Sequence, residues 1–248
     1  MSGMLQIVRF NWPWYAAGVA ASTMGWVVLP CLSRWPWPRE LALAGLAGAI
    51  WFMVSSLVVS GWVYDGSVLR RWTWIRQRLP KPPATAANIH AGFDETSRAL
   101  VDFFPRAQIA VWDIYQPALT TEGSIARARR LQNSPPSARK AEFSHLPEGD
   151  GVLDAVFLLF AAHEIRSGRA RDEFFGELFR ILKPSGTVLI TEHLRDWKNF
   201  LAFGPGFLHF LPRQEWVRLA KNAGFLLAEE FSITPFVRVF RLVKPTDL

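Results

Sequence analysis

The sequence contains a single cysteine, Cys31, among 248 residues. One cysteine excludes an intrachain disulfide framework and a zinc site built from several cysteines. The sequence also lacks internal repeats and low-complexity tracts, which excludes a repeat architecture. A length of 248 residues is sufficient for one α/β domain of ordinary size together with an additional segment.

Acidic residues are scarce relative to basic ones, with 21 Asp and Glu against 28 Lys and Arg and a formal net charge of +7. Such an excess is one property of nucleic-acid-binding proteins. Much of it lies directly after a long apolar run, where anionic lipid headgroups explain it better; these residues are Arg70, Arg71, Arg76, Arg78 and Lys81. We therefore expect membrane lipids as partners, and no nucleic acid.

Two N-terminal runs lack a polar face, one over residues 14–32 and one over residues 41–63. Each is roughly 20 residues long, which is enough to cross a bilayer. The short turn between them carries Trp35 and Trp37, and other tryptophans lie near the far ends, as an aromatic belt requires. A signal peptide would not explain the second run, and a buried hairpin of a soluble protein normally shows a polar face. The pattern predicts a transmembrane hairpin within residues 1–65.

The distribution of cations predicts the orientation of this hairpin. Arg34 and Arg39 lie in the turn, and the denser basic cluster follows the second run. The positive-inside rule then places the C-terminal part in the cytoplasm, as part of an integral protein of the inner or plasma membrane. Residues 66–83 are expected to form a basic amphipathic juxtamembrane helix, over 66–79, and a linker. The alternative is an ordinary first helix packed on a sheet.

From residue 84 to residue 248, strand-like and helix-like patterns alternate. Strands are predicted at residues 87–91, 109–113, 141–143, 152–160, 188–190, 225–231 and 236–243. Helices are predicted at residues 95–104, 122–131, 171–182 and 213–223. Such alternation indicates an α/β fold with a doubly wound, mostly parallel seven-stranded sheet.

The segment Glu177–Glu192 contains the most specific motif of the chain. An amphipathic helix leads to Lys183 and Pro184, which suit a helix end, and Gly186 allows the chain to turn into a buried strand. This segment resembles the signature E-L-x-R-x-L-K-P-G-G-x-L of class I S-adenosylmethionine (SAM)-dependent methyltransferases, with Ser185 in place of the first glycine.

The resemblance covers residues 87–244 and implies a Rossmann-like fold, SAM as cofactor and transfer of a methyl group. Class I methyltransferases usually carry a G-x-G-x-G loop after the first strand, whereas this chain has only Gly92. Asp94 or Glu95 is expected to pair with the cationic amino group of SAM. Asp94 could instead cap the following helix.

Asp113 ends the second predicted strand, about 20 residues beyond Gly92, and is expected to accept hydrogen bonds from the ribose hydroxyls. A plain strand-terminal acid is the alternative. Ile114 or Tyr115 would then lie against the adenine. Residues 141–147 resemble the family element G-D-A-x-x-L-P, and this resemblance places Glu142 and Phe143 beside the adenine.

Two histidines are candidate catalytic residues because the resemblance places the loops after the fourth and fifth strands near the methyl group. His163 follows the fourth strand beside Glu164, and His193 follows the fifth beside Glu192. Neutral imidazole can accept a proton from the acceptor, and a carboxylate can orient it. The alternative is that these histidines line the pocket without chemistry. No metal is expected.

The segment 197–212 is too apolar for a solvated loop and is split by the sequence Gly204-Pro-Gly206. We interpret it as a lid for a hydrophobic acceptor, with His209 in a structural role. The sequence thus predicts a membrane-anchored SAM-dependent methyltransferase that acts on a small or lipophilic molecule, and it leaves the acceptor and oligomeric state open. The alternative, motivated by the single glycine, is a catalytically inactive SAM-binding membrane module. A nicotinamide dehydrogenase is disfavoured because two fingerprint glycines are absent.

Overall fold

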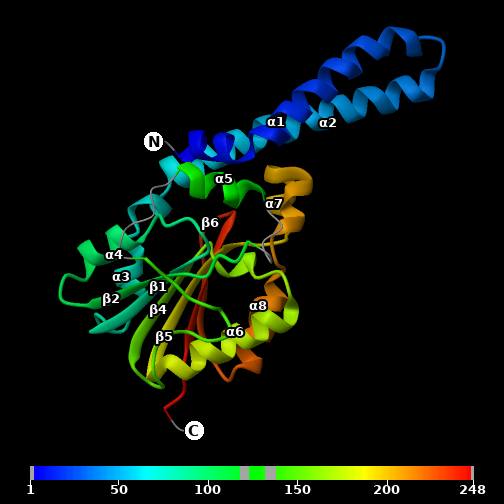
Figure 1. Ribbon diagram of the computed structural model, residues 1–248. Helices are drawn as coiled ribbons and strands as arrows, with labels where there is room; N and C mark the ends of the chain where they lie inside the picture. The colour runs from blue at the N-terminus through cyan, green and yellow to red at the C-terminus, as the bar shows by residue number, and fades with distance from the viewer. Residues whose placement is uncertain (1–2, 118–122, 132–137, 247–248) are drawn as a thin grey trace.

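Seven strands form one twisted sheet in the order β3-β2-β1-β4-β5-β7-β6 in the computed structural model, which describes residues 3–117, 123–131 and 138–246 (Figure 1). The strands are β1 Thr85–His90, β2 Gln108–Asp113, β3 Arg139–Lys140, β4 Leu153–Leu159, β5 Leu182–His193, β6 Leu226–Thr234 and β7 Val237–Val243. The first five are parallel, and β7 is antiparallel to both neighbours. The carboxyl ends of β1, β2, β4 and β5 therefore meet at one edge, which faces the N-terminal helices.

Helices cover both faces of the sheet and divide the core into two clusters. On one face, α6 (Gly168–Ile181) and α8 (Arg213–Asn222) contribute buried residues such as Phe174 and Trp216. On the other, α4 (Ser97–Phe103) and α3 (Trp74–Arg78) contribute Leu100 and Ile75. Alternate side chains of β4 enter the two clusters, as expected for a strand that is buried on both faces. The predicted doubly wound α/β fold is confirmed.

Some predicted elements differ from those observed. The short strand expected at 141–143 lies at Arg139–Lys140. The single helix expected over 66–79 is wrong: η3 (Val68–Arg71) and α3 are separated by Trp72, which has a left-handed backbone with φ 53°. The apolar side chains of this segment, including Leu69, are buried against the sheet, so the alternative of packing on the sheet is confirmed. Helix α5 is described from Gly123 to Leu131, and its predicted first residue, Glu122, lies outside the described residues.

The helix–turn–strand motif forms without a separate turn. Helix α6 ends at Ile181, and β5 begins at Leu182. Leu153 of β4 pairs with Leu182, whereas Ala155 pairs with Thr187, so residues 183–186 form a bulge in β5. Ser185, at the position of the missing glycine, has φ 63°.

Two long helices form a hairpin that projects from the domain (Figure 1). They are α1 (Gly3–Val28, continued by η1 Leu29–Leu32) and α2 (Pro36–Ser60, continued by η2 Gly61–Gly66). Each of α1 and α2 is about 38 Å long at 1.5 Å per residue. Large apolar side chains point outward, with Trp26 61% and Val27 67% exposed. By length and composition, both helices could cross a membrane.

We predict that Ser185→Gly stabilises the protein. A left-handed backbone costs a non-glycine residue about 1–2 kcal/mol, and the entropic penalty of glycine is about 0.5–1 kcal/mol. The expected net gain is about 0.5–1 kcal/mol, or a melting temperature higher by about 1–4 °C. Ser185 is exposed, so no packing is lost.

The matched control is Ser232→Gly, at an exposed position in β6 with an ordinary strand backbone. This change should destabilise the protein by about 0.5–1 kcal/mol. Thermal unfolding of both variants gives the comparison, and a destabilised Ser185→Gly protein would contradict the assigned strain.

Candidate functional site

A cavity of about 780 Å³ lies between the hairpin and the carboxyl edge of the sheet. Its walls come from the inner faces of α1 and α2, from the residues that follow β1, β4 and β5, and from two short helices, α7 (Trp197–Phe203) and η5 (Gly204–His209). Ionisable residues of the lining include Tyr64, Glu95, His163, Glu164, His193 and His209. The cavity thus combines a mostly apolar wall, which includes many aromatic rings, with a few ionisable groups.

The hairpin is bonded to α7 by polar and apolar contacts. Ser55 Oγ donates to Ala202 O at 2.9 Å, and Trp51 Nε1 donates to Leu201 O at 3.1 Å. Gly204 has φ 55°, and a Cβ atom there would lie 2.7 Å from the Phe52 ring, so only glycine allows this close approach. Residues 197–212, which were predicted to form a lid, therefore contribute to the surface against which the hairpin packs.

The turn after β1 brings together three of the residues considered from the sequence. Gly92 has φ 93°, and a Cβ atom there would lie 3.1 Å from both Ile125 and Arg129 of α5. Asp94 Oδ1 accepts hydrogen bonds from the backbone N–H groups that begin α4, at 3.0 Å each, as the capping alternative predicted. Glu95 instead projects into the cavity. Burial, followed by the neighbouring Asp94 and Asp65, raises the pKa of Glu95 to about 7.

The turn after β2 is covered by α5. Asp113 is buried opposite His90 at the ends of β2 and β1. Its carboxylate forms an ion pair with Arg129 and accepts a hydrogen bond from Tyr115 N at 3.0 Å. The Arg129 guanidinium also lies over the Tyr115 ring, 4.6 Å from its centroid. The acidic residue predicted to bind ribose is therefore neutralised by a side chain of this chain.

The remaining predicted cofactor residues lie away from the cavity. Ile114 is buried in the core and donates its N–H to His90 O. Glu142 is exposed, and Phe143 is half-buried against the core. Asp113, Ile114, Glu142 and Phe143 do not line the described cavity. The structure brings Glu95, His163 and His193 to the cavity wall instead, and Gly92 lies between two lining residues, Ala91 and Phe93.

His193 connects the sheet to the hairpin. Its Nδ1 lies 2.9 Å from Phe236 O, and since a carbonyl can only accept, Nδ1 carries the proton. Its Nε2 then accepts from the Tyr64 hydroxyl at 2.8 Å. Burial is the main cause that lowers the pKa of His193 to about 4, so this ring is neutral. A hairpin residue is thereby placed in direct contact with a candidate catalytic histidine.

His163 lies in a cluster of buried charges. Its Nδ1 is 2.6 Å from Glu192 Oε2, and its Nε2 is 3.2 Å from Glu164 Oε1. His209 Nε2 also contacts Glu164 Oε1, at 3.3 Å. Burial by itself would lower the pKa of His163, but the two carboxylates outweigh it and raise the pKa to about 10. The His163 ring is therefore charged, whereas the sequence predicted a neutral base. The side chains of the adjacent residues His163 and Glu164 contact each other.

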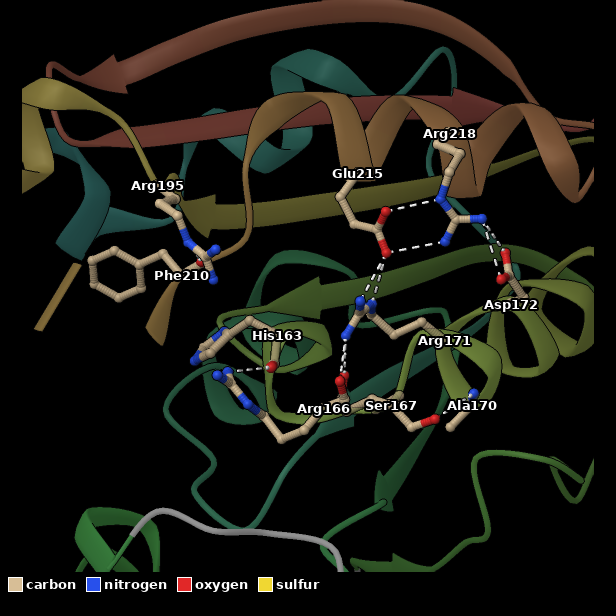
Figure 2. A network of polar contacts seen from close by, with 11 residues as sticks. His163, Arg166, Ser167, Ala170, Arg171, Asp172, Arg195, Phe210, Glu215 and Arg218 are labelled. Carbon is tan, nitrogen blue, oxygen red and sulfur yellow. Dashed lines mark hydrogen bonds and ion pairs between the residues drawn. The ribbon is translucent and has the colours of Figure 1, made fainter. Parts of the chain in front are cut away.

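An arginine–carboxylate network holds the loop that carries His163 (Figure 2). Arg171 donates to Ile165 O and Arg166 O, each at 2.9 Å, and pairs with Glu215 at 2.8 Å. Arg166 in turn donates to His163 O at 3.2 Å and to His209 O at 2.8 Å. The loop after β4 and the end of η5 are thus fixed relative to each other.

Three contributors to the site were not identified from the sequence. Tyr64 was assigned to an interfacial belt, Arg129 lies in a helix without a motif, and His209 was assigned a structural role. The available sequence signal was weak: His209 lies in a segment that is too apolar for a solvated loop. Contacts between residues 45 or more positions apart depend on the fold and have no local signature.

Comparison with known proteins matches part of this chain to a protein family. Residues 89–190 match the family described as "Methyltransferase domain". The demethylmenaquinone methyltransferase of Thermus thermophilus is 28% identical over 114 residues, which cover 46% of this chain and 49% of that protein. The chain therefore spans about half the length of this curated relative.

Solved structures agree on the fold. A SAM-dependent methyltransferase from Aquifex aeolicus has a TM-score of 0.54 and 16% identity, covering 70% of this chain and 88% of that chain. One from Methanosarcina mazei has a TM-score of 0.50 and 17% identity, covering 71% and 98%. At these identities the similarity shows the class I fold and says nothing about the acceptor. The cofactor that the family and these neighbours imply is SAM.

We predict that Glu95 gives the stability of the protein a distinct pH dependence. Because the folded-state pKa of about 7 exceeds the ordinary value of 4.5, the folded protein binds more protons between these values. The free energy of unfolding should then fall as pH rises through this window, and the loss should be complete above about pH 7. Glu95→Gln should be more stable than the wild type above this window and equal to it below.

Thermal unfolding at the two ends of the window measures the effect. Glu142→Gln removes an exposed carboxylate outside the cavity and serves as the control for the loss of one charge. Identical pH profiles for Glu95→Gln and the wild type would contradict the raised pKa of this carboxyl group.

Proposed function

We propose that this chain, which carries a class I SAM-dependent methyltransferase domain, transfers a methyl group to a lipophilic acceptor bound beneath its hairpin. The observation that carries the proposal is the cavity itself. It joins the carboxyl edge of a methyltransferase sheet to two apolar helices, and it has room for a small molecule within its volume of about 780 Å³.

The residues of the chain suit SAM at two points. Glu95 presents a carboxylate to the cavity and would hold the cationic amino group, the role left open between Asp94 and Glu95, since Asp94 caps α4. Gly92 has φ 93° and would allow SAM to approach the backbone closely once Ile125 and Arg129 of α5, which now lie against it, move away. When bound, SAM supplies an electrophilic methyl group on a sulfonium, and alignment of the acceptor supplies most of the rate.

Asp113 is the proposed ribose ligand, and it requires a rearrangement of α5. The Arg129 ion pair occupies the carboxylate that would accept the ribose hydroxyls. Arg129 would therefore leave Asp113 when the cofactor binds, with Tyr115 as its adjacent stacking partner. Helix α5 would then cover the part of the site that holds the adenosyl group of SAM.

The walls of the cavity favour an aromatic, lipophilic acceptor. Phe10, Phe160, Phe203 and Phe210 line it together with the Tyr64–His193 pair. Phe160 holds a left-handed backbone with φ 55°, which costs about 1–2 kcal/mol and places its ring 6.0 Å from that of Tyr64. The name of the Thermus thermophilus relative refers to a quinone precursor, and a prenylated quinone-type ring has the shape and apolarity that such walls suit.

The hairpin would anchor the chain in the inner or plasma membrane, with residues 84–248 in the cytoplasm. Its outward tryptophans support this location, and so do the exposed apolar residues of α7 and η5 beside it, such as Trp197 and Leu208. The exposed arginines of η3 and α3 would face anionic headgroups. An acceptor dissolved in the bilayer would then reach the cavity along the hairpin.

A second candidate function is a catalytically inactive SAM-binding membrane module with a regulatory or scaffolding role. The cover of α5 over Gly92 and the Arg129–Asp113 ion pair are the observations that favour it. Binding and transfer separate the two functions.

We predict that full-length protein with methyl-labelled SAM labels the quinone-type lipophilic fraction of a membrane extract. Lipid and small-thiol fractions are tested in parallel. SAM binding measured by titration calorimetry without label on any fraction would favour the inactive module, and no binding of SAM or its demethylated product would exclude both functions.

Two variants define the cofactor site in the same calorimetry. Asp113→Asn should weaken SAM binding about 10- to 100-fold, since hydrogen bonds to a charged group contribute about 1.5–3 kcal/mol. Arg129→Met removes the competing ion pair and should bind SAM at least as tightly as the wild type. Unchanged affinity in Asp113→Asn would remove Asp113 from the site, and loss of binding in Arg129→Met would contradict the proposed displacement.

We predict that Cys31, the single cysteine, reacts with a membrane-impermeant maleimide added to intact cells whose outer membrane is permeable. Cys31 is exposed in η1, next to the turn between α1 and α2, and the proposed orientation puts it on the side of the membrane away from the catalytic domain. The control carries Cys31→Ser with Ser232→Cys in the domain and should react only after lysis. Reaction of Cys31 only after lysis would contradict the transmembrane orientation.

A further inference from the structure

We propose that His163, Glu164 and His209 bind one divalent transition-metal ion at the wall of the cavity. The three ligand atoms, His163 Nε2, Glu164 Oε1 and His209 Nε2, lie within 4.8 Å of one another, and the two contacts to Glu164 measure 3.2 and 3.3 Å. Ligand atoms about 2.0–2.2 Å from a zinc ion are about 3.0–3.5 Å apart in tetrahedral or octahedral geometry. The two spacings to Glu164 are therefore already those of a metal site, and the two histidines lie close enough to complete it after a small adjustment.

Glu164 supplies an independent observation. The residue is 7% exposed, and its Oε2 is buried without a hydrogen-bond partner among the residues that the structure describes. A buried carboxylate oxygen without a partner is unfavourable unless a cation compensates it. Both histidine contacts reach the other oxygen, Oε1. A metal ion bound at Oε1 would displace the proton of His163 and would compensate the charge of this buried carboxylate in its place.

The groups behind the cluster have the arrangement of a metal site's outer shell. His163 Nδ1 lies 2.6 Å from Glu192 Oε2, and Glu192 is fully buried and also accepts from Ala162 N at 3.1 Å. This is the carboxylate–histidine–metal pattern, in which the carboxylate fixes the ring and directs its other nitrogen at the ion. Arg166 binds the main-chain oxygens of His163 and His209 and so holds two ligands in register.

The donor set selects the class of ion. Two imidazoles and one carboxylate suit zinc and the neighbouring ions Fe²⁺, Co²⁺ and Mn²⁺, whereas Mg²⁺ and Ca²⁺ prefer oxygen ligands throughout. Three protein ligands leave a coordination position open, and all three residues line the cavity. An oxygen or sulfur atom of a bound small molecule would be the additional ligand. The sequence suggested no metal because His163, Glu164 and His209 match no common ligand spacing.

The test is a zinc titration of the untagged, chelator-treated full chain in detergent, followed by Co²⁺ substitution. We expect one ion per chain, and visible Co²⁺ absorption bands that respond to the ligands. Glu164→Gln and His209→Asn should each weaken binding by more than about 10-fold, and Glu192→Gln, which alters the outer shell, by about 10- to 100-fold. His145→Asn and Glu142→Gln change an exposed histidine and an exposed carboxylate elsewhere and should leave binding unchanged.

Two results would overturn the proposal. Less than one-tenth of an equivalent of zinc or cobalt bound by folded wild-type protein would show that the cluster is an ion-pair network only. Full binding in folded Glu164→Gln and His209→Asn would place the ion elsewhere. If these variants fail to fold, spectroscopy of the wild-type protein decides. Its Co²⁺ absorption bands and its X-ray absorption spectrum must then show two nitrogen ligands and one oxygen ligand from the protein.

Discussion

The contact between the hairpin and the carboxyl edge of the sheet is the constraint on which the site depends. Ser55 and Trp51 bond α2 to α7, the Gly204 backbone passes against Phe52, and Tyr64 reaches His193. Without these contacts the cavity would have no roof, and the ends of β1, β4 and β5 would open to solvent. The hairpin is therefore part of the site, and its apolar outer face is a second property of the same helices.

Enclosure by the hairpin also determines the chemistry of the ionisable groups beneath it. Partial exclusion of water and the nearby Asp94 and Asp65 raise the pKa of Glu95 to about 7, whereas two carboxylates hold His163 charged. His193 stays neutral because burial lowers its pKa and its two partners, a carbonyl and a hydroxyl, carry no charge that would offset the burial. Three neighbouring groups thus differ in charge because their partners differ. A cation at Glu95 and a metal ion at Glu164 would each compensate a carboxylate that the chain leaves incompletely paired.

The sequence was sufficient for the sheet because local patterns reflect burial on both faces, and the motif at Glu177–Glu192 identified the fold. It failed at residues 66–79, where helical periodicity could not reveal the left-handed residue Trp72 that divides the segment. Within the site, Asp113 was located at a strand end as predicted, but its partner Arg129 depends on where α5 packs. The cluster at His163 required Glu192 and His209, which come from a neighbouring strand and a distant helix, and no spacing in the sequence encodes that encounter.

The central claim is that hairpin and domain together enclose a lipophilic acceptor, and photo-crosslinking tests it most directly. Full-length protein in vesicles would be irradiated with a photoreactive prenylated quinone analogue, and the adducts mapped by mass spectrometry. The account predicts adducts on both walls of the cavity, at residues such as Phe10 and Phe210, that excess unreactive analogue suppresses. Adducts confined to outward-facing residues such as Trp26, with none on the domain, would contradict it.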